Sequence, residues 1–422
     1  MSAAPEPLRI AILGLNYAPE EIGIARYSHG MAEGLALRGL AVEMVAGAPY
    51  YPQWQVYPGF GGWWRRSVEN GVALTRCPHY VPARPTGLRR IIHLSSFALS
   101  ALPSALGWAL RRRAHRPRIV MAVAPALLSV PVAWLGARLA GARLWVHIQD
   151  FEVEAALATG LVDAGLAGRL AKWVERRILG LADVISTISP QMVARLEAKG
   201  LARERLAEVR NWADASVAPD PAGGAAYRAQ WNLGTRQVAL YSGNIANKQG
   251  IEILVEVARL LADRRDLAFV ICGQGPNRAA LEKLASGLDN IQFHDLQPSA
   301  RMGELLSLAA VHLLPQIPGA ADLLLPSKLT NMLASGRPVV ATAAAGTGLA
   351  GEVEGCGLVS EPGDAAAMAA AISRLLDDPE LSARFGVAAR ERAQERWSQA
   401  AIIDRLAAWL RALAPPCPEQ AG

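Results

Sequence analysis

Short apolar runs along the chain alternate with longer stretches whose apolar positions recur every three to four residues. We interpret the short runs, rich in Val, Ile and Leu, as buried strands and the longer stretches as amphipathic helices. This alternation is typical of βαβ units that build a parallel sheet. The predicted strands cover residues 8–14, 41–47, 118–124, 143–148, 183–189, 207–211, 237–243, 267–273, 290–294, 310–315 and 337–343.

The pattern runs twice, and the segment between the two runs has no periodicity. That segment, residues 212–226, is rich in Asp, Pro, Gly and Ala. We therefore predict an N-terminal domain over 1–211, a linker over 212–226 and a C-terminal domain over 227–395. The fold class is α/β, with two Rossmann-like domains facing each other across a cleft. Ligands of open α/β sheets bind at the carboxyl ends of the strands, so we expect the cleft to hold the active site.

The end of the chain has a helical pattern of its own, from Pro379 to about Arg411. We expect residues 396–422 to form a helix that packs back across the domains, followed by a disordered tail.

Composition limits the class of protein. The chain has 422 residues, 52% of them hydrophobic and 19% charged, which excludes general disorder and fits two domains. The four cysteines form no CxxC pair, and the N-terminus predicts a strand in place of a signal peptide. We therefore expect a cytoplasmic protein.

Positive charge is concentrated in the first half. Residues 1–210 carry 25 basic and 15 acidic side chains, a net charge of +10, whereas residues 211–422 carry 18 and 22, a net charge of −4. Within this half, residues 88–113 have an uncharged run of 17 residues between arginine clusters. Such a segment is short for a membrane span, and we expect it to attach peripherally to an anionic membrane surface. The alternative is a buried helix with solvated arginines at its ends.

Two stretches of the first half place polar or glycine residues after predicted strands. Gly23 stands where a helix starts, and the backbone N–H groups there favour an anion such as a phosphate. A glycine tolerated in a loop is the alternative. His147 and Asp150 stand at the end of the strand over 143–148, where active-site side chains are expected. A structural histidine bonded to a backbone carbonyl is the alternative for His147. Asp150, Glu152 and Glu154 alternate, as in some metal sites, but no His or further Asp accompanies them at ligand spacing, and we expect no metal.

The second half repeats this arrangement with lysine. Asn244 and Lys248 lie in the turn after the strand over 237–243, and Lys328 follows Ser327 at the start of another helix. Because the chain has only five lysines against 38 arginines, we interpret these two as compact charges for a diphosphate, with a solvated position as the alternative for each. Two further glycines, Gly273 and Gly275, follow the next strand.

Seven segments together resemble the bacterial exopolysaccharide glycosyltransferases of retaining family 4, in particular those of colanic acid and O-antigen type. The resemblance spans roughly residues 8–400 and implies a GT-B fold. It further implies a nucleotide-diphosphate sugar bound mainly by the C-terminal domain, an acceptor bound mainly by the N-terminal domain, and no required metal. The segments are NYAPEEIGIARY, APYYPQWQVYPG, HIQDFEVEAA, SGNIANKQG, CGQGP, LLPQ and ADLLLPSKLTNMLASGRPVVATA.

The resemblance implies roles for individual residues. His147 matches the histidine that contacts the donor sugar, and Gly23 matches the glycine whose loop meets the phosphates. Lys248 matches the lysine that pairs with the diphosphate, and Ser327 lies where a second phosphate-binding helix begins.

Two positions depart from the family pattern. Asn244 replaces an arginine, and Asn331 replaces the second of two glutamates, the usual ribose-binding carboxylate. Asp322 is the candidate to substitute for the first glutamate.

The implied function is transfer of a sugar from a UDP- or GDP-linked donor to a polyprenyl-diphosphate-linked saccharide, with no cofactor besides this co-substrate. Two other classes remain as alternatives: a sugar-nucleotide epimerase of GT-B shape, and a basic nucleic-acid-binding protein. No nucleic-acid-binding motif accompanies the positive charge, so we expect no nucleic-acid partner.

Overall fold

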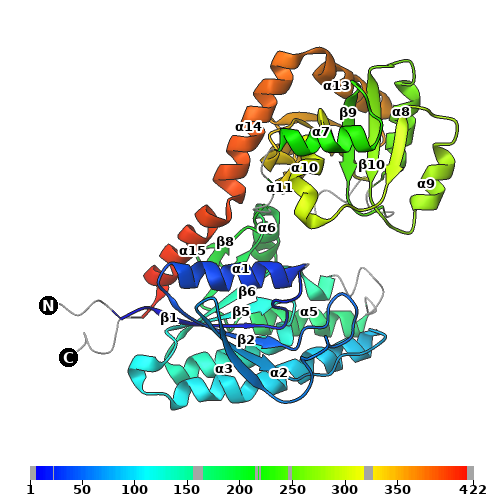
Figure 1. Cartoon of the computed structure of the whole chain (residues 1–422). Helices are drawn as coiled ribbons and strands as arrows, with labels where there is room; N and C mark the ends of the chain where they lie inside the picture. Colours follow the sequence, from blue (N-terminus) through cyan, green and yellow to red (C-terminus); the bar gives the residue numbers. More distant parts are fainter. Residues whose placement is uncertain are drawn as a thin grey trace. The chain divides into compact units, whose positions relative to one another are not determined.

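The computed structural model describes residues 6–21, 23–154, 165–213, 217, 220–245, 250–317 and 327–415, with Ser299 and Ser327 described by their backbone alone. The chain forms two compact α/β units (Figure 1). The N-terminal unit comprises Met1–Arg210 and Ile402–Gly422, and the C-terminal unit comprises Asn211–Ala401.

The N-terminal unit is built on one sheet with strand order β3-β4-β2-β1-β5-β6-β7-β8 among the residues described. The strands pair in parallel except for β3, which is antiparallel to β4. The strands are β1 (Arg9–Gly14), β2 (Ala41–Gly47), β3 (Arg65–Glu69), β4 (Val72–Cys77), β5 (Ile119–Ala124), β6 (Arg143–Ile148), β7 (Val184–Thr187) and β8 (Leu206–Glu208). The helices are α1 (Ile24–Leu37), α2 (Gly87–Leu110), α3 (Val130–Ala140), α5 (Leu166–Leu179), α6 (Pro190–Ala198) and α15 (Gln399–Leu413).

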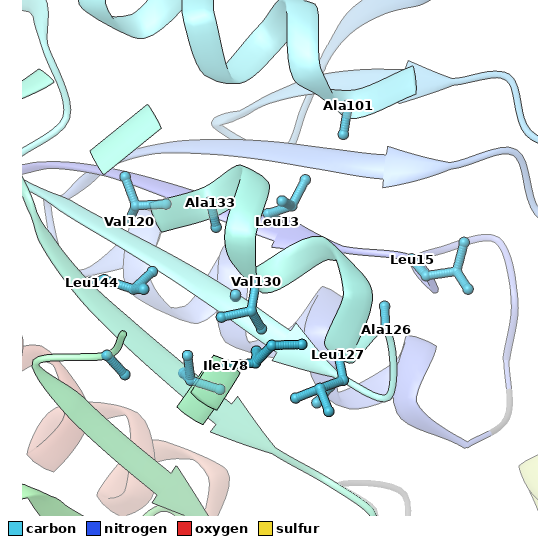
Figure 2. Close-up of a cluster of buried hydrophobic side chains, with 14 of the residues drawn as sticks. Leu13, Leu15, Ala101, Val120, Ala126, Leu127, Val130, Ala133, Leu144 and Ile178 are labelled. Carbon is cyan, nitrogen blue, oxygen red and sulfur yellow. The ribbon is translucent and has the colours of Figure 1, made fainter. Parts of the chain in front are cut away.

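Both faces of this sheet are covered by helices, as its apolar strands require. On one face, side chains of β1, β5 and β6 gather with those of α3 and α5, as Figure 2 shows for Leu13, Leu144, Val130 and Ile178. On the other face, Trp145 of β6 stacks on Trp409 of α15, with ring centroids 6.5 Å apart.

Helix α2 packs one side against the core and leaves the other side exposed. Phe97, Ala101 and Trp108 are buried, whereas Leu99 is 69% exposed. By length and composition α2 qualifies as a membrane span, with a third of its most apolar window buried, which is weak evidence for a span. Helix α2 therefore has a core-packed face and an exposed apolar face.

The C-terminal unit has a parallel sheet with strand order β11-β10-β9-β12-β13-β14 among the residues described. Its strands are β9 (Gln237–Ser242), β10 (Leu267–Cys272), β11 (Ile291–His294), β12 (Val311–Leu314), β13 (Val339–Thr342) and β14 (Gly357–Ser360). Its helices are α7 (Pro221–Gln230), α8 (Glu252–Leu260), α9 (Arg278–Leu284), α10 (Met302–Ser307), α11 (Ser327–Ala334), α12 (Gly348–Val353), α13 (Ala365–Asp377) and α14 (Pro379–Trp397). Successive strand residues alternate between two clusters: Tyr241 and Phe269 pack with α8 and α13, whereas Leu240 and Val270 pack with α7 and α10.

The structure confirms the predicted strands to within a few residues and adds three that the pattern missed. β3 and β4 form an antiparallel pair, which a repeat of strand and helix does not predict. The first four residues of β3 are also exposed, so this strand lacks the apolar run by which a buried strand is identified. The third, β14, is a short edge strand.

Two other sequence predictions need correction. Part of the segment predicted as a linker, from Pro221 onward, forms helix α7, whose N-cap Asp220 accepts a hydrogen bond from the backbone N–H of Gly223. The helical stretch after Pro379 is two helices, which separate at Ser398. The first, α14, packs in the core of the C-terminal unit, while α15 from Ile402 onward belongs to the N-terminal unit.

The packing of α2 predicts a position-dependent loss of stability. Phe97→Ala removes a fully buried ring and should lower the free energy of unfolding by about 3–5 kcal/mol. Leu99→Ala, two residues away on the exposed side, should change it by less than about 0.5 kcal/mol. Urea-induced unfolding followed by tryptophan fluorescence measures both, and equal losses would contradict the packing of α2.

Candidate active site

In each sheet, as far as the structure describes it, the strand order reverses at the first strand in sequence, and both points carry predicted site residues. β1 lies between β2 and β5, and β9 lies between β10 and β12. At such a point the connections on either side diverge, which opens space at the carboxyl ends of the strands where ligands bind. The loop after β9 begins with Gly243 and Asn244, and α11 follows β12.

Lys328 lies at the carboxyl end of β9, although it comes from α11. Its Nζ donates a hydrogen bond to the Tyr241 hydroxyl at 2.9 Å and lies 4.2 Å from the centroid of that ring. The Tyr241 hydroxyl in turn donates to the backbone carbonyl of Asn244 at 2.6 Å. The ammonium group of Lys328 thereby joins the first turn of α11 to the end of β9 and to the loop that follows β9.

Desolvation of Lys328 lowers its pKa to about 8. Below that pH the ammonium form predominates, and the charge is lost as the pH rises through about 8. A bound anion would stabilise the charged form and raise the pKa again. A half-buried ammonium that donates to a neutral hydroxyl can therefore attract a phosphate more strongly than an exposed lysine could.

Gly273 and Gly275 are explained by the close approach of two loops. A Cβ atom at Gly273 would lie 2.0 Å from the carbonyl oxygen of Gly243, and one at Gly275 would lie 2.1 Å from that of Ile245. Backbone hydrogen bonds join the same loops, from Gly243 N to Cys272 O and from Ile245 N to Gln274 O, each 2.9 Å long. These glycines thus fix the shape of the loop that carries Asn244, whether or not they touch a ligand.

The structure describes only some of the other predicted residues of this unit. Asn244 is exposed, and Asn331 is half-buried within α11. Ser327 is the first residue of α11, while Lys248 and Asp322 lie outside the described residues.

In the N-terminal unit, Gly23 immediately precedes α1. Its φ of 65° lies in the left-handed region that favours glycine, and a Cβ atom there would meet nothing within 4 Å. The backbone at the start of α1 therefore borders open space, which is the arrangement that a phosphate-binding helix N-terminus needs.

His147 is placed at the carboxyl end of β6 but is almost completely buried, with 1% exposure. Its Nδ1 lies 2.8 Å from Ser186 Oγ and its Nε2 lies 2.9 Å from Gln149 Nε2. Burial lowers the pKa of His147 to about 4, so the imidazole is neutral at physiological pH. Asp150 is exposed in the turn after β6.

Glu152, just beyond Asp150, is a functional candidate that the sequence offered only as one member of an alternating acidic run. Its Oε2 accepts a hydrogen bond from the backbone N–H of Leu127 at 2.8 Å. Desolvation, together with the negative charges of Asp150 and Glu175, raises the pKa of Glu152 to about 7. The carboxyl group is therefore poised between its two protonation states near neutral pH.

Sequence reasoning missed Tyr241, Ser186 and Gln149, which contact the predicted lysine and histidine. Tyr241 and Gln149 were visible in principle, because each stands within two residues of a strand end that was already under consideration. Ser186 was not, because its contact with His147 spans two neighbouring strands 39 residues apart.

Comparison with known proteins gives the family. A glycosyl transferase 4-like domain matches residues 23–212, and a glycosyl transferases group 1 domain matches residues 236–378. The putative colanic acid biosynthesis glycosyl transferase WcaI of Escherichia coli is 39% identical over 92% of this chain and 96% of its own length. The chain belongs to glycosyltransferase family 4, as the motifs predicted. Neither the epimerase nor the nucleic-acid-binding alternative is favoured.

Solved structures confirm the GT-B fold. The structure of Anabaena HepE in complex with UDP aligns with a TM-score of 0.70 at 14% identity, covering 96% of this chain and all of the other. Sucrose-phosphate synthase from Thermosynechococcus elongatus aligns with a TM-score of 0.69 at 21% identity, covering 96% and 98%. At this level of identity the likeness shows the fold alone.

The interlocked loops of the C-terminal unit predict a steric effect. Gly273→Ala should destabilise this unit by about 2 kcal/mol or more, because the new methyl group meets a backbone carbonyl that cannot move independently. Gly351→Ala is the matched control, since a Cβ there meets nothing within 4 Å and α12 should gain up to about 1 kcal/mol. Thermal unfolding by calorimetry compares the two, and a Gly273→Ala protein as stable as the wild type would contradict the loop geometry.

Proposed function

We propose that this protein is a retaining glycosyltransferase that moves a sugar from a UDP- or GDP-linked donor to a lipid-linked saccharide in exopolysaccharide, capsule or O-antigen biosynthesis. The family supports the reaction type, the likeness to WcaI supports the polysaccharide context, and the HepE complex with UDP supports a nucleotide donor.

The observation that carries the donor half of the proposal is the ammonium of Lys328 beside Tyr241. It lies at the strand-order reversal of the C-terminal sheet and has a neutral partner, so it is suited to a diphosphate. Lys248, which follows β9 in the sequence, is the second cation that we propose for this diphosphate, as the family resemblance implies.

The proposed chemistry needs no nucleophile from the protein and no metal. The bond between the anomeric carbon and the diphosphate oxygen breaks, and a bond from that carbon to an acceptor oxygen forms on the same face. The acceptor hydroxyl passes its proton to the departing diphosphate. The lysine ammonium groups and helix N–H groups stabilise the negative charge that develops on the leaving group, and this stabilisation lowers the barrier.

The first test removes the ammonium group. Lys328→Ala should weaken binding of UDP or GDP at least about tenfold, because a charge-assisted hydrogen bond to phosphate contributes about 1.5–3 kcal/mol. In the wild type, affinity should fall as the pH rises through about 8, and Lys328→Ala should lose this dependence because the titrating group is gone. Isothermal titration calorimetry at several pH values measures both effects.

Matched variants separate charge from general damage. Lys283→Ala removes an exposed lysine of the same unit and should leave affinity unchanged. Tyr241→Phe keeps the ring under the ammonium but removes its hydrogen-bond acceptor, and should cost roughly three- to tenfold in affinity. Unchanged nucleotide binding by a folded Lys328→Ala protein would refute the assignment.

For the acceptor half, the exposed side of α2 supports a peripheral position on the cytoplasmic membrane surface. Leu88, Ile91 and Leu99 project from it into solvent. The exposed arginines Arg89 and Arg90 lie near its start, and Arg111, Arg112 and Arg113 follow its end. A surface of this composition can dock on anionic lipid, where each basic residue contributes about 1 kcal/mol.

A tryptophan pair extends this surface beside the middle of α2. Trp64 donates a hydrogen bond from Nε1 to the carbonyl of Ser100 in α2 at 2.8 Å, and Trp63 is 82% exposed next to it. Exposed tryptophan is suited to the headgroup region because its ring is apolar and its N–H is polar. We propose that α2 and this pair lie in the plane of the membrane surface, where a polyprenyl-linked acceptor would be met.

Liposome flotation tests the docking. The wild type should float with vesicles that contain anionic lipid and should remain unbound with purely zwitterionic vesicles. A Trp63→Ser, Leu99→Ser double variant should lose most of the binding, whereas Leu37→Ser, an exposed leucine on α1, should not. Equal flotation of all variants, or no wild-type binding at moderate salt, would reject the surface.

A further inference from the structure

The surroundings of His147 determine which of its ring nitrogens carries the proton. The indole Nε1 of Trp145 can only donate, and it donates to Ser186 Oγ at 2.7 Å. The Gln149 amide nitrogen is also a donor, and it lies 2.9 Å from Nε2 of His147. With the Gln149 amide in this orientation Nε2 accepts, and the proton of the neutral ring is on Nδ1.

The remaining contact agrees with this assignment. With its proton on Nδ1, His147 donates to Ser186 Oγ at 2.8 Å, and that oxygen accepts from both Trp145 and His147. Ser186 is fully buried, so the ring nitrogen has this hydroxyl in place of water. The contacts thus link β6, β7 and the residue after β6 around one imidazole.

We infer that Ser186 and Gln149 are positioning residues that hold His147 in the Nδ1–H form, so that Nε2 can accept a hydrogen bond from a hydroxyl of the sugar substrate. Gln149 occupies this acceptor position in the absence of substrate, and a substrate hydroxyl takes its place. This inference rests on the proposed glycosyl transfer for its kinetic consequence, but not for the position of the proton.

The chemical role that follows is specific. A neutral ring with an accepting Nε2 can orient a hydroxyl, but it cannot protonate a leaving group. Burial already opposes the charged form, because it lowers the pKa of His147 to about 4. His147 should therefore remain neutral over the range in which an ordinary histidine titrates.

Nuclear magnetic resonance of the full-length protein labelled in its histidine rings tests the position of the proton. The His147 signals, identified by their loss in a His147→Asn protein, should show a neutral ring with the proton on Nδ1 from about pH 5 to about pH 8. A proton on Nε2, or titration near pH 6.5, would overturn the inference whatever the enzyme does.

Two substitutions of Gln149 distinguish positioning from a structural role. Gln149→Glu places a carboxylate beside Nε2, which should draw the proton to Nε2, raise the pKa of His147 and remove the accepting lone pair. Gln149→Leu has no donor but leaves that lone pair intact. We expect kcat to fall at least about tenfold in Gln149→Glu and less in Gln149→Leu, with little change in KM for the acceptor.

A merely structural role predicts the opposite order, because glutamate preserves the size and polarity of glutamine. A smaller loss in Gln149→Glu than in Gln149→Leu would therefore overturn the inference. Gln230→Glu, at an exposed position of the C-terminal unit, controls for the added negative charge and should leave kcat unchanged. If the wild type transfers no sugar, the proposed function fails, while the proton measurement still decides the state of His147.

Discussion

The reversal of strand order at β1 and at β9 is the constraint on which the candidate site depends. Where the strand order reverses, the connections on the two sides of the central strand lie on opposite faces of the sheet. The space between them admits polar groups that a continuous core would exclude. Lys328 of α11 meets Tyr241 at the end of β9 in this way, although 87 residues separate the two.

Burial makes the charged form of both Lys328 and His147 less favourable, and it lowers the pKa of each. Lys328 has a pKa lowered to about 8, and within the part of the chain that the structure describes it donates to a hydroxyl. Such a group is stabilised when an anion arrives, whereas a lysine already in a salt bridge would have to exchange partners. His147 is neutral at physiological pH, because its pKa is lowered to about 4. The side chains of Ser186 and Gln149 contact its two ring nitrogens and fix the ring. The first group is suited to binding charge and the second to orienting a hydroxyl.

Helix α2 shows why a single pattern can support two interpretations. Its uncharged run was consistent with membrane attachment and with burial, because both environments select apolar residues. Phe97 and Trp108 are buried on one side of the helix, and Leu88 and Leu99 are exposed to solvent on the other. The helix therefore contributes to the core of the N-terminal unit and also presents an apolar surface with arginines at both ends.

The sequence by itself determined the two α/β units, the positions of the predicted strands along the chain and the family, because periodicity and local motifs are properties of neighbouring residues. It also placed His147, Asn244 and Lys328 at strand or helix ends. Tertiary structure alone decided that Lys328 meets Tyr241, that Ser186 and Gln149 contact His147, and that Gly273 lies where two backbones approach closely. It also decided the antiparallel pairing of β3, which breaks the repeat. These contacts join residues from different strands and loops, and their distances are set by sheet order and burial, which no local pattern encodes.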